Sequence, residues 1–178
     1  MKETRERRGF SGAMRIVISP FSRKLRTDDP NRENAKHYAH WERLLRMIKE
    51  AFPDSEIIQI GVDGEKILPG VDRTEFSLSF REVAELIKSC DLWISVDNFL
   101  PHLCNSYFRE SKPGIVIFTR SDPNIYGYAH NFNVLKSRKY LRPDQFGIWE
   151  SCSYDPNSSP DPETVLQVIS KLRLEDSF

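Results

Sequence analysis

Apolar residues in this chain recur with two different spacings, and the two spacings alternate from one end to the other. Between residues 35 and 52 they fall three or four positions apart, the period of a helix with one buried face. Similar stretches predict helices over 80–90, 101–108 and 164–172. Apolar runs too short for helices predict buried strands over 14–18, 56–60, 91–97 and 114–118, with a fifth over 132–135.

This alternation predicts the fold class. Strands separated by helices imply right-handed crossover units and a parallel sheet. We therefore expect an α/β fold consisting of a single Rossmann-like, doubly wound and mainly parallel sheet. Ligands bind beyond the carboxyl ends of the strands in such sheets, so the loops after residues 18, 60, 96 and 118 are the candidate site.

Length and composition restrict the kind of protein. At 178 residues with 39% hydrophobic side chains, the chain has the size of one domain, placed at 14–178, after a predicted disordered arm at 1–13. The 26 basic and 26 acidic residues cancel, which argues against nucleic acid as a partner.

No stretch approaches the ~20 apolar residues of a membrane span, so we expect a cytoplasmic protein. Three separated cysteines predict buried or free thiols, and the four histidines form no recognised metal-ligand set.

The loop after the first strand combines hydroxyl and cationic side chains. Ser22 and Arg23 follow the strand, and Lys36 opens the predicted first helix. Unpaired amides at a helix N-terminus together with a lysine favour a diphosphate. The glycine-rich phosphate motifs are absent, so ordinary capping and solvated charge remain the alternative.

The next two loops carry carboxylates. Glu65 follows the second strand, where an acid can accept hydrogen bonds from ribose hydroxyls or can belong to a plain polar turn. Asp97, Asn98 and His102 follow the third strand. They can bind sugar hydroxyls or phosphate, or exchange protons, since a carboxylate tunes an imidazole. The alternative is that Asp97 caps a helix and His102 packs beneath it.

The loop after the fourth strand again combines hydroxyls with a cation. Thr119 and Ser121 flank Arg120, and Asp122 follows before a proline. Side chains of this kind suit a phosphate group, and the turn residues predict a rigid segment.

Taken in the order in which they follow one another along the chain, these motifs resemble those of one known family. The chain is similar to the carboxyl-terminal, donor-binding half of GT-B glycosyltransferases of the heptosyltransferase-like family 9 over residues 14–145. The similarity rests on the motifs Ser19-Pro20-Phe21-Ser22-Arg23, Lys36-His37-Tyr38, Gly61 with Glu65, Cys90-Asp91-Leu92-Trp93-Ile94, Asp97 to His102, Lys112-Pro113 and Phe118 to Pro123.

The resemblance implies roles for these residues. Ser22 and Lys36 would hold the donor diphosphate, Glu65 the ribose, and Asp97, Asn98 and His102 the sugar-phosphate region. Two departures stand out. Phe99 replaces a small residue of the family turn and is expected to crowd phosphate, and the stretch between Arg23 and Lys36 is longer than usual.

The resemblance also implies a function. We expect a metal-independent glycosyltransferase without a cofactor that takes a nucleotide-sugar donor, as a stand-alone donor half or with a partner. The family's acceptor domain, which carries the catalytic base, has no counterpart before the first strand, so a homodimer or a separate acceptor-domain partner would supply that side. The alternative is a non-catalytic nucleotide or nucleotide-sugar binding module. A third hypothesis is that the protein acts on a DNA or glycan acceptor and that the basic arm at 2–8 guides this polyanion.

Overall fold

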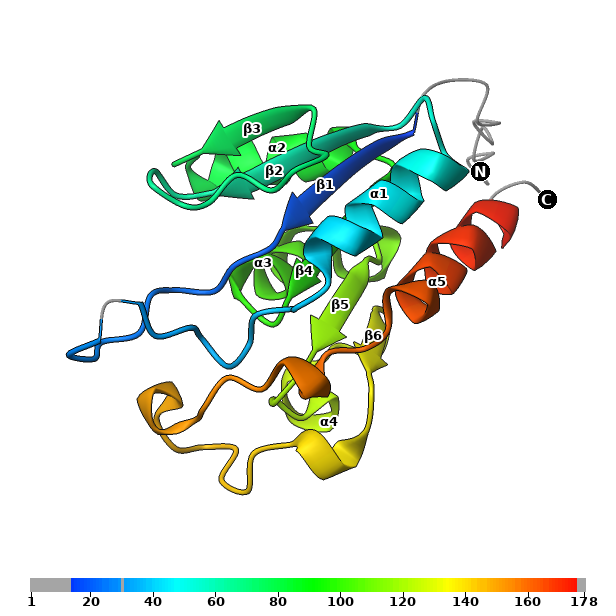
Figure 1. The fold of residues 1–178 in the computed structure, drawn as a ribbon. Helices are drawn as coiled ribbons and strands as arrows, with labels where there is room; N and C mark the ends of the chain where they lie inside the picture. The colour runs from blue at the N-terminus through cyan, green and yellow to red at the C-terminus, as the bar shows by residue number, and fades with distance from the viewer. Residues whose placement is uncertain (1–13, 30, 176–178) are drawn as a thin grey trace.

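The computed structural model describes residues 14–29 and 31–175, and it contains one six-stranded sheet (Figure 1). The arm predicted at 1–13 lies outside the described residues. All strand pairs are parallel, in the order β3-β2-β1-β4-β5-β6, which is the order of the Rossmann fold. The strands are β1 (Arg15–Ser19), β2 (Glu56–Gly61), β3 (Arg73–Phe76), β4 (Leu92–Val96), β5 (Ile115–Phe118) and β6 (Phe132–Leu135). The predicted fold class is confirmed.

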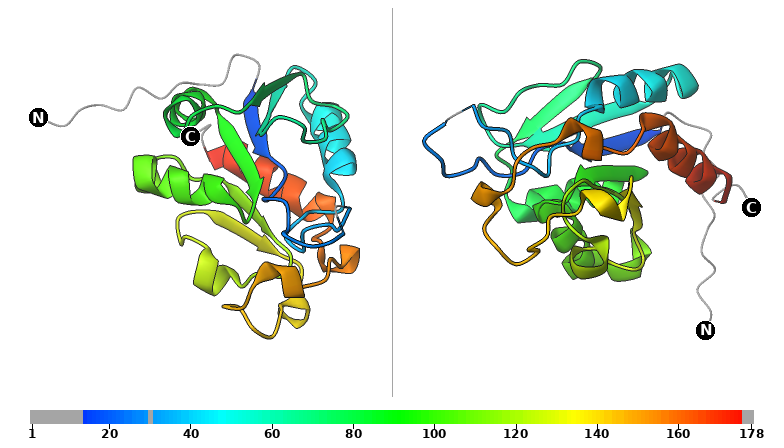
Figure 2. Two further views of the ribbon diagram at one scale, coloured as in Figure 1. Left: turned by 90° about the vertical axis from the view of Figure 1, so that its left-hand side faces the viewer. Right: turned by 60° about the horizontal axis from the view of Figure 1, so that its bottom comes forward.

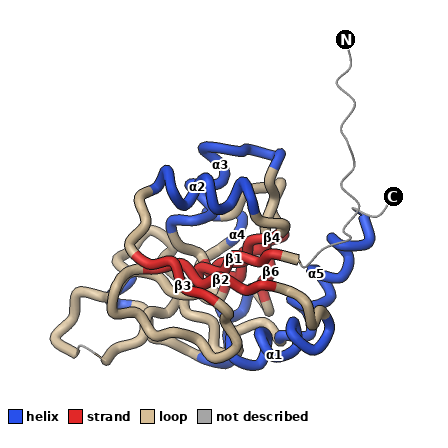
Figure 3. Tube along the Cα trace, turned by 90° about the horizontal axis from the view of Figure 1, so that it is seen from above, coloured by secondary structure: helices blue, strands red, loops and turns tan. Residues whose placement is uncertain are grey.

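Helices cover both faces of the sheet (Figure 3). α1 (Trp41–Ala51) and α5 (Pro162–Glu175) lie on one face, while α2 (Phe80–Ser89) and α3 (Phe99–Phe108) lie on the other. A single turn, α4 (Pro123–Tyr126), follows β5. Because side chains alternate along a strand, Ile16 and Ile18 of β1 enter the core under α1 and α5, and Val17 enters the core under α2 and α3.

Several elements differ from the sequence predictions, including α5, which begins at Pro162 rather than at residue 164 and ends at Glu175 rather than at residue 172. The first helix begins at Trp41 rather than at residue 35, because Asn34 folds the chain into a turn: its side-chain oxygen accepts from the Lys36 amide, and its carbonyl accepts from His37. β3 was not predicted because its sequence, Arg-Thr-Glu-Phe, has no apolar run; it is an edge strand. α3 begins at Phe99, two residues earlier than predicted.

Two long connections extend beyond the carboxyl edge of the sheet. Figures 1 and 2 show that the chain between β1 and α1 and the chain between β6 and α5 both run past this edge. The predicted loops therefore have a neighbour, residues 136–161, that comes from much later in the sequence.

The three cysteines belong to the packed interior of the domain. Cys90, Cys104 and Cys152 are all buried and unpaired, as predicted. Burial raises the pKa of the Cys90 thiol to about 11 and that of Cys104 to about 12. Among the described residues, none of the helices is long and apolar enough to cross a bilayer.

We predict that Gly114→Ala destabilises the fold by about 1–3 kcal/mol, because the new Cβ overlaps the indole of the fully buried Trp93. Thermal or denaturant unfolding measures the loss. Trp93→Phe removes part of the obstructing ring, so the double variant is expected to lose less than the sum of the two single losses. Strict additivity would show that the two residues are not in steric conflict.

Candidate functional site

A cavity of about 810 Å³ opens at the carboxyl edge of the sheet. Its wall contains side chains from the loops after β1, β2, β3 and β4, the arrangement expected of a ligand site in an open parallel sheet. Six of the ten predicted site residues line it: Ser22, Arg23, Lys36, Glu65, Asn98 and His102.

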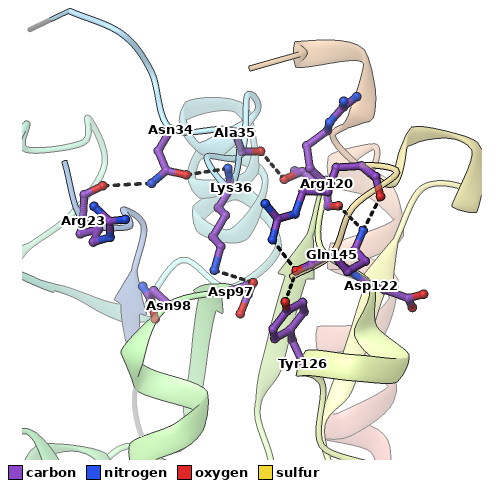
Figure 4. Close-up of polar contacts among 12 residues, drawn as sticks. Arg23, Asn34, Ala35, Lys36, Asp97, Asn98, Arg120, Asp122, Tyr126 and Gln145 are labelled. Carbon is purple, nitrogen blue, oxygen red and sulfur yellow. Dashed lines mark hydrogen bonds and ion pairs between the residues drawn. The ribbon is translucent and has the colours of Figure 1, made fainter. Parts of the chain in front are cut away.

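The Lys36 ammonium lies between a carboxylate and an aromatic ring. Its Nζ is 2.9 Å from Oδ2 of Asp97, which is buried at the end of β4 (Figure 4). The same nitrogen lies 4.5 Å from the centre of the Trp149 ring, a cation–π contact. Because α1 starts five residues after Lys36, the helix dipole invoked for this lysine does not act at its position.

Asn98 joins two of the predicted loops. Its side-chain nitrogen donates to Oγ of Ser19 at 2.8 Å and to the carbonyl of Phe21 at 2.9 Å, while its oxygen accepts from the Leu100 amide and caps α3. Since Leu100 is engaged and Pro101 has no amide hydrogen, the start of α3 has few donors for an anion. Cationic side chains are the stronger anion ligands of this cavity.

Glu65 is held in a fixed loop over the end of β2. The buried Gln59 donates to the carbonyl of Lys66 at 2.8 Å and accepts from the Leu68 amide at 2.9 Å, which anchors the loop on its far side. A Cβ at Gly61 would overlap the Glu65 carboxylate, so glycine is what lets the acid lie against the strand. Burial raises the pKa of Glu65 above its usual value.

Two phenylalanines form an aromatic rim on the α2–α3 side of the cavity. The rings of Phe80 and Phe99 stack with centroids 5.9 Å apart and planes 29° apart, and their exposed fractions are 65% and 37%. Both line the cavity. The Phe99 ring, which is expected from the sequence to crowd a phosphate, packs on Phe80 at the rim. Phe80 was not singled out, because in the sequence it is one apolar position at the start of a helix.

His102 and Asp97 have different partners. Nδ1 of the exposed His102 is 2.9 Å from the Tyr128 hydroxyl, whereas the Asp97 carboxylate pairs with Lys36. The interaction expected between this imidazole and this carboxylate is therefore not among the contacts of the described residues. His102 lines the cavity from the first turns of α3.

The fourth predicted loop does not line the cavity. The Thr119 hydroxyl donates to the Ala35 carbonyl at 2.7 Å, and Ser121 is fully buried. Asp122 caps α4 and binds the Arg138 guanidinium through both oxygens, at 3.1 and 2.6 Å; this pairing lowers its pKa. Thr119 and Asp122 thus connect loops to one another, whereas the buried Ser121 hydroxyl has no hydrogen-bond partner among the described residues.

Residues between β6 and α5 complete the cavity wall. Trp149 lines it, and Arg142 stacks on the same ring, 3.6 Å from its centre. Oε1 of Glu150 accepts from Nη1 of Arg23 at 2.9 Å and from the Arg26 amide at 3.2 Å, and these bonds lower the Glu150 pKa to about 2. No spacing pattern in the sequence pointed to them, since Lys36 lies 106 residues before Arg142 and 113 residues before Trp149, and Arg23 lies earlier still.

The fold has relatives among solved structures. The Escherichia coli ADP-heptose lipopolysaccharide heptosyltransferase II superposes with a TM-score of 0.64 at 14% identity, covering 94% of this chain and 49% of that one. The dodecameric, iron-containing heptosyltransferase TibC, solved with ADP-D-β-D-heptose, gives 0.60 at 17% identity, covering 92% and 46%. No protein-family model and no curated protein matches the chain in sequence.

These matches concern the fold. The chain spans about half the length of the two heptosyltransferases it superposes on. The resemblance seen in the sequence, to one half of a heptosyltransferase-like GT-B enzyme, is confirmed at the level of the fold. The described chain has the fold of one Rossmann-like half of a heptosyltransferase-like GT-B glycosyltransferase.

Proposed function

We propose that the cavity binds a nucleotide-sugar through its nucleoside diphosphate and that the protein acts as a glycosyltransferase. The observation that carries this proposal is the order of chemistry along the sheet edge. Neighbouring strands β3, β2 and β1 present an aromatic ring at Phe80, a carboxylate at Glu65, and cations at Arg23 and Lys36. A nucleoside diphosphate carries a planar base, ribose hydroxyls and a charged diphosphate in the same order.

Each part of a nucleoside diphosphate matches a property of the cavity wall. The base would continue the Phe80–Phe99 stack, a contact that tolerates any base. The Glu65 carboxylate would accept hydrogen bonds from the ribose. Lys36, Arg23 and the Ser22 hydroxyl would bind the diphosphate, since ammonium and guanidinium groups form strong charge-assisted bonds to phosphate oxygens.

The same residues account for chemistry without a metal. In direct displacement at the anomeric carbon, negative charge develops on the leaving diphosphate, which Lys36 and Arg23 would stabilise. Asp97 would position Lys36 through their 2.9 Å ion pair. His102 would exchange a proton near the transferred sugar, with Tyr128 at its Nδ1 fixing the ring. Thr119, Ser121 and Asp122 would support this arrangement by fixing the adjoining loop.

An acceptor side would face this edge of the sheet. Most of the exposed large apolar side chains among the described residues lie in segments that follow the carboxyl ends of strands: Val62, Ile67, Phe80, Phe99, Ile125, Phe146 and Ile148. Such a concentration is typical of a surface that another lobe or subunit covers. A second copy of this chain or a separate acceptor domain would provide that cover.

Thermal unfolding with nucleoside diphosphates and their sugar conjugates tests the proposal. At about one hundred times the dissociation constant, a true ligand stabilises the fold by about 2.7 kcal/mol, a shift of several degrees. A glycosyltransferase and a non-catalytic nucleotide-binding module would both show this shift. Only the glycosyltransferase would release sugar from the donor faster than the buffer blank does. Absence of a shift with every nucleotide contradicts both functions.

We predict that Lys36→Met weakens ADP binding by about 1.5–3 kcal/mol, the loss of a charge-assisted bond. Calorimetry measures the affinity, and Lys36→Arg is expected to retain most of it. Lys139→Met is the matched control, because Lys139 also lies over an aromatic ring, at 4.9 Å from Tyr140, but outside the cavity. Equal losses in Lys36→Met and the control would place the diphosphate elsewhere.

The Glu65 carboxylate gives a pH prediction. Burial raises its pKa, so as pH falls it protonates and loses acceptor strength earlier than an exposed glutamate does. The ratio of affinities for ADP and 2′-deoxy-ADP should therefore decrease between pH 7 and pH 5, and this ratio cancels effects on the phosphates. In Glu65→Gln the ratio should be low and independent of pH. A pH-independent ratio in the wild-type protein would exclude Glu65 from the ribose site.

A further inference from the structure

The segment from Arg142 to Glu150, here called the strap, contacts both candidate diphosphate cations. It follows β6 and lies beside the cavity (Figure 1, yellow to orange). Trp149 lies on the Lys36 ammonium and Glu150 binds Arg23. These two adjacent strap residues thus reach the two loop residues that would hold the diphosphate.

The strap is anchored at its start. The buried Arg142 donates its amide to the Arg120 carbonyl at 3.0 Å, just after β5. Its guanidinium donates to the carbonyls of Gln145 and Gly147, the latter at 2.8 Å, and stacks on Trp149. Arg142 therefore folds the strap against the domain and leaves Glu150 to be held by contacts at the cavity.

Those contacts imitate an anionic ligand. One Glu150 oxygen accepts from the Arg23 guanidinium and from the Arg26 backbone amide, the pair of donor types that a phosphate oxygen takes in proteins. Glu150 is ionised at neutral pH, because the same bonds lower its pKa to about 2. The Glu150 side chain is 17% exposed and that of Arg23 57%, so the guanidinium is open to solvent and to another anion.

We propose that Glu150 is an internal counter-anion that competes with the ligand diphosphate for Arg23 and so sets the affinity of the cavity for anions. This inference rests on the proposed function. Binding of the diphosphate displaces the carboxylate from Arg23 and from the Arg26 amide, and it releases the end of the strap. Trp149, adjacent to Glu150, changes its surroundings at the same time.

The test compares ADP affinities of variants by calorimetry. Glu150→Gln is expected to bind ADP about two- to fivefold more tightly than wild type, the range of one exposed ion pair. Glu163→Gln is the matched control: it removes an exposed carboxylate that pairs with Arg43, away from the cavity, and should leave the affinity unchanged. In an Arg23→Ala background the gain from Glu150→Gln should shrink, because only the competition for the Arg26 amide remains.

Tryptophan fluorescence gives a second readout. Trp41 and Trp93 are buried, so a change in emission on adding ADP should come from Trp149 and should vanish in Trp149→Phe. Unchanged affinity in Glu150→Gln, or the same gain without Arg23, overturns the competition while ADP binding itself still supports the donor site. Failure of wild type and Glu150→Gln alike to bind ADP or any other nucleoside diphosphate overturns the proposed function and this inference with it.

Discussion

The ion pair between Lys36 and Asp97 is the interaction around which the carboxyl edge is organised. Asp97 ends the central strand β4 as a buried carboxylate, and an unpaired buried charge is costly. Lys36 offsets this cost from a turn that precedes α1, so the long β1–α1 connection must return to the sheet. Trp149 then packs on the same ammonium and brings in the chain after β6. Three distant segments therefore meet at one charge.

Around this ion pair, side chains of different chemical type occupy different parts of the carboxyl edge of the sheet. The Glu65 carboxylate and the Phe80 ring lie on the β2–β3 side, and the cations Arg23 and Lys36 lie on the β1 side. The division follows from strand order, because each parallel strand delivers its loop to the same edge. A ligand that carries an apolar ring, hydroxyls and a charged group at successive positions complements such a wall better than a symmetric ligand does.

The sequence predicted what depends on local pattern. Apolar runs such as the one at Ile115–Phe118 identified five of the six strands and hence the parallel sheet. The charged edge strand β3 lacks that pattern, and the first helix started late because Asn34 formed a turn. Six predicted site residues line the cavity, since they lie on the segments that follow β1, β2 and β4. Phe80 and Trp149 were missed because their roles arise from contacts between segments distant in the chain.

Asn98 has a mechanical consequence for the cavity. One amide side chain binds both the loop after β1 and the first turn of α3, so these two parts of the wall must shift together or remain still. Arg142 anchors the start of the strap, but Trp149 and Glu150 at its cavity end contact the β1 loop through the Lys36 ammonium, the Arg26 amide and the exposed Arg23 side chain. The cavity thus combines a stiff half with a compliant half, and a ligand can adjust its width from one side only.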